Sequence, residues 1–235
     1  MKKVINFSGG KTSAYMTIKE YQKGDIVIFC DTGREHPKTY KFINDFEAHE
    51  NIPIIRLSYK GGFPELIKKR KAIPNNAKRF CTIEMKVKTA RRYLRSIGIT
   101  EYENFIGFRA DEKERVIKRK SYWQKVVDRF PLYDQGINKE QINEFWNSKP
   151  YNLEIPSILG NCTLCFMKGK NAIISILREY PELAEEWIKD EQENGKFTYI
   201  SGIKMKQLLQ IANANLFKGH KLEDIKPSYN CACTN

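Results

Sequence analysis

Short β-branched and aromatic segments alternate with helix-length segments over the first half of the chain. Residues 3–7 form the first apolar segment, residues 13–22 a helix-length segment and residues 25–30 the next apolar segment. This order is typical of a βαβ unit, in which a crossover helix joins two parallel strands. The alternation continues with helices predicted over 38–50 and 86–97 and strands predicted over 52–57 and 104–107. The sequence therefore predicts an α/β fold, a Rossmann-like doubly wound parallel sheet with helices on both faces.

The second half of the chain follows a different pattern. Beyond about residue 130, polar turns and prolines separate helical segments, which are predicted over 139–146, 171–180 and 204–213. The chain has 235 residues, of which 41% are hydrophobic, and this is enough to bury a sizeable core. We therefore expect a core domain over residues 1–130 and a mainly helical, cysteine-containing C-terminal region over residues 131–235.

The sequence contains no apolar run of about 18 residues, the length that a membrane-spanning helix requires. The N-terminal segment MKKVINF leads directly into a glycine-containing loop and has no apolar stretch typical of a signal peptide. We therefore expect a cytoplasmic protein that has no membrane partner.

A glycine-containing loop lies between the first predicted strand and the first predicted helix. In a parallel α/β sheet this turn is the usual phosphate site, because it lies at the carboxyl end of the strand. Glycines allow backbone N–H groups to approach an anion, and the following helix presents its unpaired N–H groups at the same place. Three hydroxyl groups and one ammonium group add further donors. The loop therefore predicts a site for phosphate or pyrophosphate, formed by Ser8, Gly9, Gly10, Lys11, Thr12 and Ser13.

Positive charge is concentrated in the middle of the chain. The sequence has 41 basic and 28 acidic residues and a net charge of +13 at pH 7, and residues 60–120 contain 18 basic and 7 acidic residues. Such a charge distribution attracts polyanions, either nucleic acid or a small substrate with several phosphates. A basic surface that only maintains solubility explains the same composition. The charge therefore leaves both interpretations open.

Four sequence blocks resemble those of a known family. The loop at 8–13 resembles a pyrophosphate loop, and DTGREHPKTYKF at 31–42 resembles the block after the second strand. RFCTIEMK at 79–86 resembles an Arg-x-Cys block, and GFRADEKER at 107–115 resembles a Gly-x-Arg-x-x-Glu-x-x-Arg block. The family is that of the phosphoadenosine phosphosulfate (PAPS) reductases, within the PP-loop adenine-nucleotide α-hydrolases. The resemblance covers about the first 130 residues and implies a HUP-type fold and a PP-loop core that binds ATP or PAPS.

The resemblance also implies which residues hold the nucleotide. The loop at 8–13 would hold the β- and γ-phosphates of ATP or the equivalent anion, and Asp31, Thr32 and Gly33 would border the nucleotide. Mg²⁺ would accompany the nucleotide, but Thr12 stands where the family more usually has an acidic residue. How this chain holds Mg²⁺ is therefore open.

Four basic residues in the third and fourth blocks match the basic groups of the family. The resemblance implies that they hold substrate phosphate or sulfate and offset the charge that develops at the reacting centre. Arginines near strand ends suit bidentate binding of oxyanions, although an ordinary surface ion pair explains any one of them as well. We expect Arg79 to bind the nucleotide and three residues to be catalytic, namely Lys86, Arg109 and Arg115.

The six cysteines raise the question of a metal site, because cytosolic thiols are normally kept reduced. By resemblance to iron-sulfur members of the family, Cys81, Cys162 and Cys165 would bind a [4Fe-4S] cluster, with Cys231 or Cys233 as the fourth ligand. A structural zinc ion accepts the same four thiolates. Two further alternatives are a mobile pair of C-terminal thiols that attacks a substrate sulfur and a set of buried, inert thiols.

The family resemblance predicts an enzyme that acts in sulfur chemistry. One version adenylylates a substrate with release of pyrophosphate and then accepts sulfur from a donor; the other reduces PAPS with a thiol reductant. The C-terminal Cys-Ala-Cys sequence does not reproduce the Cys-Gly-type motif of thiol-dependent PAPS reductases. The basic residues make tRNA or DNA a possible thiolated substrate, and we expect a homo-oligomer of undetermined size. The alternative is a nucleic-acid-binding module with a structural zinc ion and no turnover.

Overall fold

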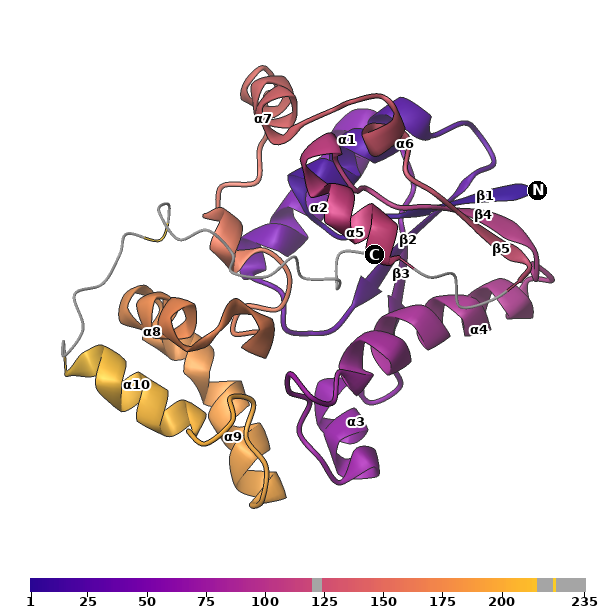
Figure 1. Cartoon of the computed structure of the whole chain (residues 1–235). Coiled ribbons are helices and arrows are strands. Elements are labelled where there is room, and N and C mark those ends of the chain that lie inside the picture. The colour runs from indigo at the N-terminus through magenta and orange to yellow at the C-terminus, as the bar shows by residue number, and fades with distance from the viewer. Residues whose placement is uncertain (120–123, 215–221, 223–235) are drawn as a thin grey trace.

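The computed structural model describes residues 1–119, 124–214 and 222 of the chain. A five-stranded sheet lies at its centre, with every strand parallel to its neighbours and the order β3-β2-β1-β4-β5 (Figure 1). The predicted doubly wound α/β fold is therefore confirmed. The strands are β1 (Lys2–Asn6), β2 (Ile26–Asp31), β3 (Ile55–Ser58), β4 (Tyr102–Phe105) and β5 (Val126–Arg129).

The direction of the sheet order changes at β1. The chain adds β2 and β3 on one side of β1 and then returns to add β4 and β5 on the other side. In open parallel sheets, ligands bind outside the carboxyl ends of the strands at such a switch point. The loop that follows β1 therefore lies where this fold class places a ligand.

Each helix predicted from the sequence is present, with shifts of a few residues at its ends, whereas the helices over 62–70, 113–118, 131–134 and 185–194 were not predicted. The first helix begins at Lys11, two residues before the prediction, because Gly10 is its N-cap and has extended backbone angles. A π-helical turn over Thr82–Val87 precedes α4. The α-helices are α1 (Lys11–Glu20), α2 (Pro37–Glu50), α3 (Gly62–Arg70), α4 (Lys88–Ser96), α5 (Lys113–Lys118), α6 (Pro131–Asp134), α7 (Lys139–Asn147), α8 (Lys170–Glu179), α9 (Glu185–Asn194) and α10 (Met205–Asn213).

Each face of the sheet is covered by a different set of helices. In β1, Ile5 packs in a cluster with residues of α1, α2 and α7, whereas its neighbour Val4 packs in a second cluster with Leu94 of α4. This division follows from the two-residue period of a strand, whose successive side chains point to opposite faces. Figure 1 shows α4 on one side of the sheet and α1, α2 and α6 on the other.

Residues directly after β5 pack on the sheet. Trp146 of α7 is fully buried in the same cluster as Phe7 and Phe42, and its indole Nε1 donates to the carbonyl oxygen of Lys11 at 2.9 Å. This hydrogen bond satisfies the indole N–H in an apolar setting and fixes α7 beside the start of α1. α7 is thereby held against the loop that follows β1.

A third hydrophobic cluster lies beside the sheet. Helices α8, α9 and α10 lie together in Figure 1, and they pack with α3. Fully buried members include Leu66 of α3 and Ile173 of α8, and Met85 of the π-helical turn is also buried there. This C-terminal cluster therefore includes residues from the first half of the chain.

No helix in residues 1–119 or 124–214 is long and apolar enough to cross a membrane.

Candidate nucleotide-binding site

The loop between β1 and α1 has a backbone shape that depends on glycine. Gly9 has φ of +78°, a left-handed conformation that residues with a Cβ atom rarely adopt. A Cβ atom at this position would lie 2.8 Å from Cγ2 of Thr39 and 3.3 Å from Cδ1 of Ile43, both on α2. The loop is therefore seated directly on α2.

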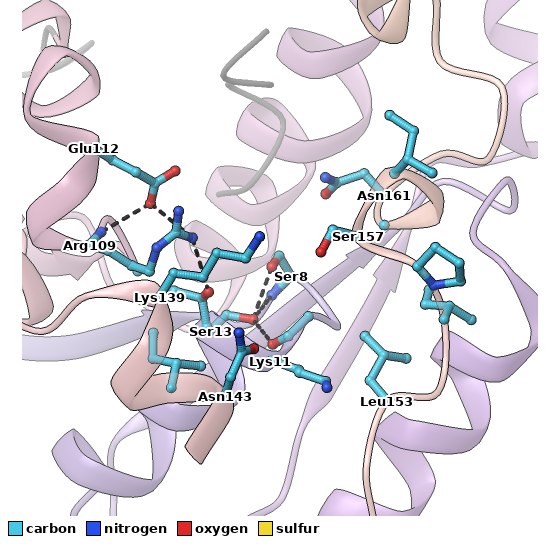
Figure 2. A pocket seen from close by; sticks show the side chains of 18 of the residues that line it. Ser8, Lys11, Ser13, Arg109, Glu112, Lys139, Asn143, Leu153, Ser157 and Asn161 are labelled. Atoms are coloured by element: carbon cyan, nitrogen blue, oxygen red, sulfur yellow. Dashed lines mark hydrogen bonds and ion pairs between the residues drawn. The ribbon is translucent and has the colours of Figure 1, made fainter. Parts of the chain in front are cut away.

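The hydroxyl groups of the loop hold it closed. The Ser13 Oγ atom accepts a hydrogen bond from the Ser8 backbone N–H at 3.0 Å and donates to the Gly10 carbonyl oxygen at 3.0 Å. The Ser8 and Ser13 hydroxyl oxygens are 2.9 Å apart (Figure 2). The start of α1 has no side-chain cap, so its first N–H groups remain available to an anion at the helix N-terminus.

The loop forms the floor of a cavity of about 350 Å³. Its other walls come from residues 107–115, from α7 and from residues 153–168, segments far apart in the sequence. Figure 2 shows Arg109 and Lys139 on one side of the cavity and Ser157 and Asn161 on the other, with Ser8 and Ser13 between them. A cavity of this volume with convergent polar groups is typical of a small-molecule site.

Arg109 connects the fourth sequence block to the loop. Its Nη1 atom lies 3.4 Å from the Thr12 hydroxyl oxygen, and its Nε and Nη2 atoms form a bidentate pair with Asp111 at 2.9 and 2.8 Å. A Cβ atom at Gly107 would lie in van der Waals contact with Cα of Ser13, at 3.4 Å. The block at 107–115 is therefore packed directly against the start of α1.

The electrostatics of the cavity favour an anion. Lys11, Arg109, Arg115 and Lys139 line it, and partial burial lowers the pKa of the Lys11 ammonium below its usual range. Within the described residues, the lining contains one carboxylate, that of Glu112. Glu112 forms ion pairs with Arg109 at 3.4 Å and with Arg115. The positive charge of the lining therefore exceeds its negative charge, and an anionic ligand would neutralise the excess.

A protein-held Mg²⁺ does not fit these residues. Magnesium in phosphate sites is normally bound by one or two carboxylates together with the substrate phosphates. Glu112 is committed to two arginines, and the Thr12 hydroxyl faces the Arg109 guanidinium. The first turn of α1 contains no acidic residue. The described lining therefore offers no uncommitted carboxylate for the ion.

Asp31, Thr32 and Gly33, which were expected to border the nucleotide, lie at the end of β2 behind one wall of the cavity. The Asp31 carboxylate accepts from the Gly33 N–H at 2.7 Å and from the Tyr40 hydroxyl at 2.8 Å. The Thr32 hydroxyl lies 3.3 Å from the Cys162 sulfur. The cavity lining within the described chain comes from other segments, and residues around Cys162 separate this loop from it.

Lys86 and Arg79 lie away from the described lining of the cavity. Lys86 is buried, and its positive charge opposes the effect of burial on Glu35, whose pKa is raised because the carboxyl is fully enclosed. Arg79 is half-buried and lies three positions before the π-helical turn. The third block therefore lies near the end of β2, whereas Arg109 and Arg115 of the fourth block reach the cavity.

The described cysteines occupy three different environments. Cys30 is buried in β2, and burial raises the pKa of its thiol to about 11, which suits an inert core residue. Cys81 and Cys162 are half-buried against the C-terminal cluster, and Cys165 is buried in the cavity wall. Within the described residues, no three His, Cys, Asp or Glu side chains are arranged to hold a metal ion. Cys231 and Cys233 lie outside those residues.

Several lining residues were not predicted from the sequence. They come from α7 and from the segment around the Cys-x-x-Cys pair, and no motif marks them, because the fold alone brings them to the loop. The spacing of Cys162 and Cys165 indicated a metal site in this segment, but it predicted a role for the two thiols alone. The unpredicted polar lining residues from these two segments are Lys139, Asn143, Ser157, Asn161 and Lys168.

Comparisons with known proteins agree with the sequence blocks. The family model of the phosphoadenosine phosphosulfate reductase domain matches residues 2–150. An uncharacterized nin region protein of Escherichia phage lambda is 30% identical over 207 residues, covering 74% of this chain and 68% of the phage protein. Two uncharacterized proteins of Methanocaldococcus jannaschii are 29% and 26% identical. Each covers 78% of this chain, which spans only 40% and 46% of their own lengths.

A solved structure with a similar chain path is the PAPS reductase of Candida auris in complex with phosphate. The two proteins share 20% sequence identity, and the TM-score is 0.47. The superposition covers 65% of this chain and 76% of the reductase chain.

Proposed function

Because this chain belongs to the phosphoadenosine phosphosulfate reductase domain family, we propose that it is an enzyme that binds an adenine nucleotide and acts in sulfur chemistry. One observation carries the proposal: the cavity joins an uncapped helix N-terminus and a closed Ser-Gly-Gly loop to two arginines. Such a site suits the phosphate tail of a nucleotide.

We propose that the phosphate tail lies on the loop from Ser8 to Ser13. The backbone N–H groups of the loop and of the first turn of α1 donate to the phosphate oxygens, and Lys11 adds a positive charge. The lowered pKa of Lys11 supports this role, because an ammonium group that is partly desolvated in the free protein gains a counter-ion when phosphate binds.

In this proposal, Arg109 and Arg115 stabilise the charge that develops on the leaving group. Both line the cavity, and both are oriented by the buried Glu112 carboxylate. Preoriented donors of this kind lower a barrier because they need no rearrangement during the reaction. Lys86 acts from behind the site, where its charge balances that of Glu35.

One reaction that fits the site is adenylylation by ATP. A substrate oxygen attacks the α-phosphorus, the bond to the bridging oxygen breaks, and pyrophosphate leaves on the loop. The carbon that carries the adenylylated oxygen then accepts sulfur from a sulfur donor, its bond to that oxygen breaks, and AMP leaves. The C-terminal Cys-Ala-Cys sequence favours this version, since it departs from the Cys-Gly-type motif of thiol-dependent reductases.

The second reaction is reduction of PAPS. A thiolate attacks the terminal sulfur, the sulfur–oxygen bond breaks, and adenosine bisphosphate leaves with its phosphate on the loop. A second thiol then displaces sulfite and forms a disulfide, so that a thiol reductant supplies the two electrons. The ion pairs of Glu112 with Arg109 and Arg115 favour this version, because they leave no carboxylate in the described lining that could bind Mg²⁺.

We further propose that Cys81, Cys162 and Cys165 contribute to a four-cysteine centre completed by Cys231 or Cys233. The [4Fe-4S] cluster and the zinc ion both fit four thiolates. The support is that Cys81 and Cys162 pack against the same cluster, and that the Cys165 N–H donates to the Cys162 carbonyl oxygen at 3.2 Å. No step of either reaction is assigned to this centre.

Nucleic acid is our proposed sulfur acceptor. Lys88, Arg92 and Arg95 are exposed on α4 at positions that place them on one side of the helix, and α3 ends in Lys68, Lys69 and Arg70. A basic helix face of this kind suits a phosphate backbone. Binding to tRNA or DNA that weakens strongly with salt supports this proposal, and no retention on either at low salt contradicts it.

The test of the main proposal compares two products in one preparation: pyrophosphate from ATP and sulfite from PAPS with a thiol reductant. We expect the wild-type protein to form one of these two products. The Ser8→Ala/Ser13→Ala variant should form it at least 100-fold more slowly, because it lacks the two hydroxyl groups that hold the loop closed. The control is Ser96→Ala, which removes an exposed hydroxyl that bonds the Tyr93 carbonyl. Formation of neither product, or equal rates in the loop variant, contradicts the proposal.

A further inference from the structure

The cavity wall that faces the phosphate loop has a chemical character of its own. Ser157 and Asn161 present a hydroxyl and an amide across the cavity from Arg109 and Lys139 (Figure 2). Among the described residues, neither of these two side chains has a hydrogen-bond partner. The apolar side chains of Ile155 and Ile158 lie beside them in the lining. The wall therefore offers neutral donors and acceptors next to apolar surface.

The backbone holds these two side chains in place. A short 3-10 turn over Ser157–Leu159 carries the fully buried Leu159, and the Gly160 N–H donates to the Ser157 carbonyl oxygen at 3.2 Å. Asn161 has φ of +59°, a left-handed conformation that asparagine tolerates better than most residues. Non-glycine residues held in this conformation cluster at ligand sites.

The same segment separates the cavity from the β2 end of the sheet. Asn161 lines the cavity, whereas its neighbours turn the other way: the Cys162 sulfur lies 3.3 Å from the Thr32 hydroxyl, and the Thr163 N–H donates to the Arg34 carbonyl oxygen at 2.8 Å. The segment thus places Asn161 on the side of the cavity, and Cys162 and Thr163 on the side of the β2 loop.

The distribution of charge decides what this wall can bind. Three of the lining cations, Lys11, Arg109 and Lys139, lie on the floor and the opposite side of the cavity (Figure 2). The cation on the Asn161 wall is Lys168, which is buried and donates to the Thr163 carbonyl oxygen at 2.8 Å, on the side of Glu35. An uncharged, flat group with hydrogen-bonding edges suits this wall better than a second phosphate.

We propose that Asn161, supported by Ser157, recognises the adenine base of the nucleotide whose phosphates lie on the loop; this inference rests on the proposed function. An amide carries a donor and an acceptor side by side, which matches the amino group and the adjacent ring nitrogen of adenine. The apolar neighbours Ile155 and Ile158 contact the face of the base. Asn161 is thus the residue that determines base specificity.

The test is calorimetric titration of the full chain with ATP, ITP and inorganic pyrophosphate. ITP carries a carbonyl oxygen where ATP carries the amino group, so the wild-type protein should bind ATP about tenfold more tightly. The Asn161→Gly variant keeps the left-handed backbone without strain and loses only the amide. It should lose most of the preference for ATP, while its affinity for pyrophosphate stays within about twofold of wild type. Ser157→Ala should reduce the preference less.

The matched control is Asn51→Gly, which changes another left-handed asparagine, at φ of +53° and at the end of α2. It should leave all three affinities unchanged. An unchanged preference for ATP in Asn161→Gly, or an equal loss of pyrophosphate and ATP affinity, overturns the inference. A wild-type protein that binds pyrophosphate without preferring ATP over ITP overturns the inference alone, whereas one that binds none of the three overturns the proposed function as well.

Discussion

The guanidinium Nη1 atom of Arg109 lies 3.4 Å from the hydroxyl oxygen of Thr12, although 97 positions separate them in the sequence. The two residues belong to the first and the fourth sequence blocks, and the parallel pairing of β1 with β4 brings the blocks together. An arginine that touches the start of α1 is well placed to bind an anion held at that helix end. This contact therefore places the first and the fourth sequence blocks in the same site.

The first prediction concerns the shape of the phosphate loop. Gly9→Ala should lower both stability and pyrophosphate affinity, because the new Cβ atom meets Thr39 at 2.8 Å in a left-handed backbone. Gly98→Ala is the matched control: its φ is +79° and no atom lies within 4 Å of the added Cβ.

Gly98→Ala should cost about 1–2 kcal/mol of unfolding free energy from backbone strain alone. Gly9→Ala should cost at least about 1 kcal/mol more, since the overpacked loop must also shift. Urea unfolding and pyrophosphate titration measure the two effects. Equal stability losses, or an unchanged affinity in Gly9→Ala, would show that the loop does not depend on its seat on α2.

The second prediction concerns pH. Partial burial lowers the pKa of Lys11 in the free protein, and phosphate binds the protonated form. The affinity for pyrophosphate should therefore be highest at neutral pH, where Lys11 is protonated. It should decline as the pH rises through the lowered pKa of Lys11, which lies below the usual pKa of lysine. Lys11→Arg should remove this decline, because arginine stays charged. A parallel decline in both proteins would assign the titration to another group.

The third prediction concerns the buried ion pair between the β2 loop and α9. The side chains of Arg34 and Asp190 are 4% and 3% exposed, and Arg34 Nη2 lies 2.7 Å from the Asp190 carboxylate. Arg34→Met should destabilise the fold by about 3–5 kcal/mol, since it leaves the buried Asp190 carboxylate without a cation and with the neutral Tyr199 hydroxyl as its donor. Adding Asp190→Asn should recover part of the loss.

The pH dependence of this loss has a definite sign. Burial already raises the pKa of Asp190, and removal of the Arg34 charge raises it further. The folded Arg34→Met protein then holds its proton more tightly than the unfolded chain, so the destabilisation should shrink as pH falls through that pKa. Lys41→Met, which breaks an exposed pair with Asp45, should leave the urea midpoint unchanged. A similar urea midpoint for Arg34→Met and Lys41→Met would mean that the ion pair of Arg34 does not stabilise the packing of the β2 loop against α9.

The fourth prediction concerns the cysteines. Protein prepared without oxygen should contain roughly four irons per chain and absorb visible light if the centre is a cluster, or about one zinc and no colour if it is structural. Cys162→Ser and Cys165→Ser should both lower the metal content, whereas Cys30→Ser should retain it, because that thiol is buried in β2. Equal metal content in all three variants would remove the four-cysteine centre.

Residues marked by a local sequence signal could be predicted, whereas residues brought to the site by tertiary packing could not. The loop at 8–13 was predictable because its glycines and hydroxyls follow a strand and precede a helix, so local chemistry and position agree. β5 was not predicted, because its four residues include Asp128 and Arg129 and lie at the edge of the sheet. Asn161 and Lys139 were not predicted either, since only tertiary packing brings them to the loop.

Binding of a phosphate tail to the loop from Ser8 to Ser13 is tested most directly by a crystal structure of the protein with pyrophosphate or ATP. We expect two linked phosphate groups on the loop, within hydrogen-bonding distance of the backbone N–H groups of Gly10 to Ser13, with Arg109 turned toward them. Phosphate bound elsewhere on the chain, with the Ser8 to Ser13 loop empty at a saturating ligand concentration, would contradict the account.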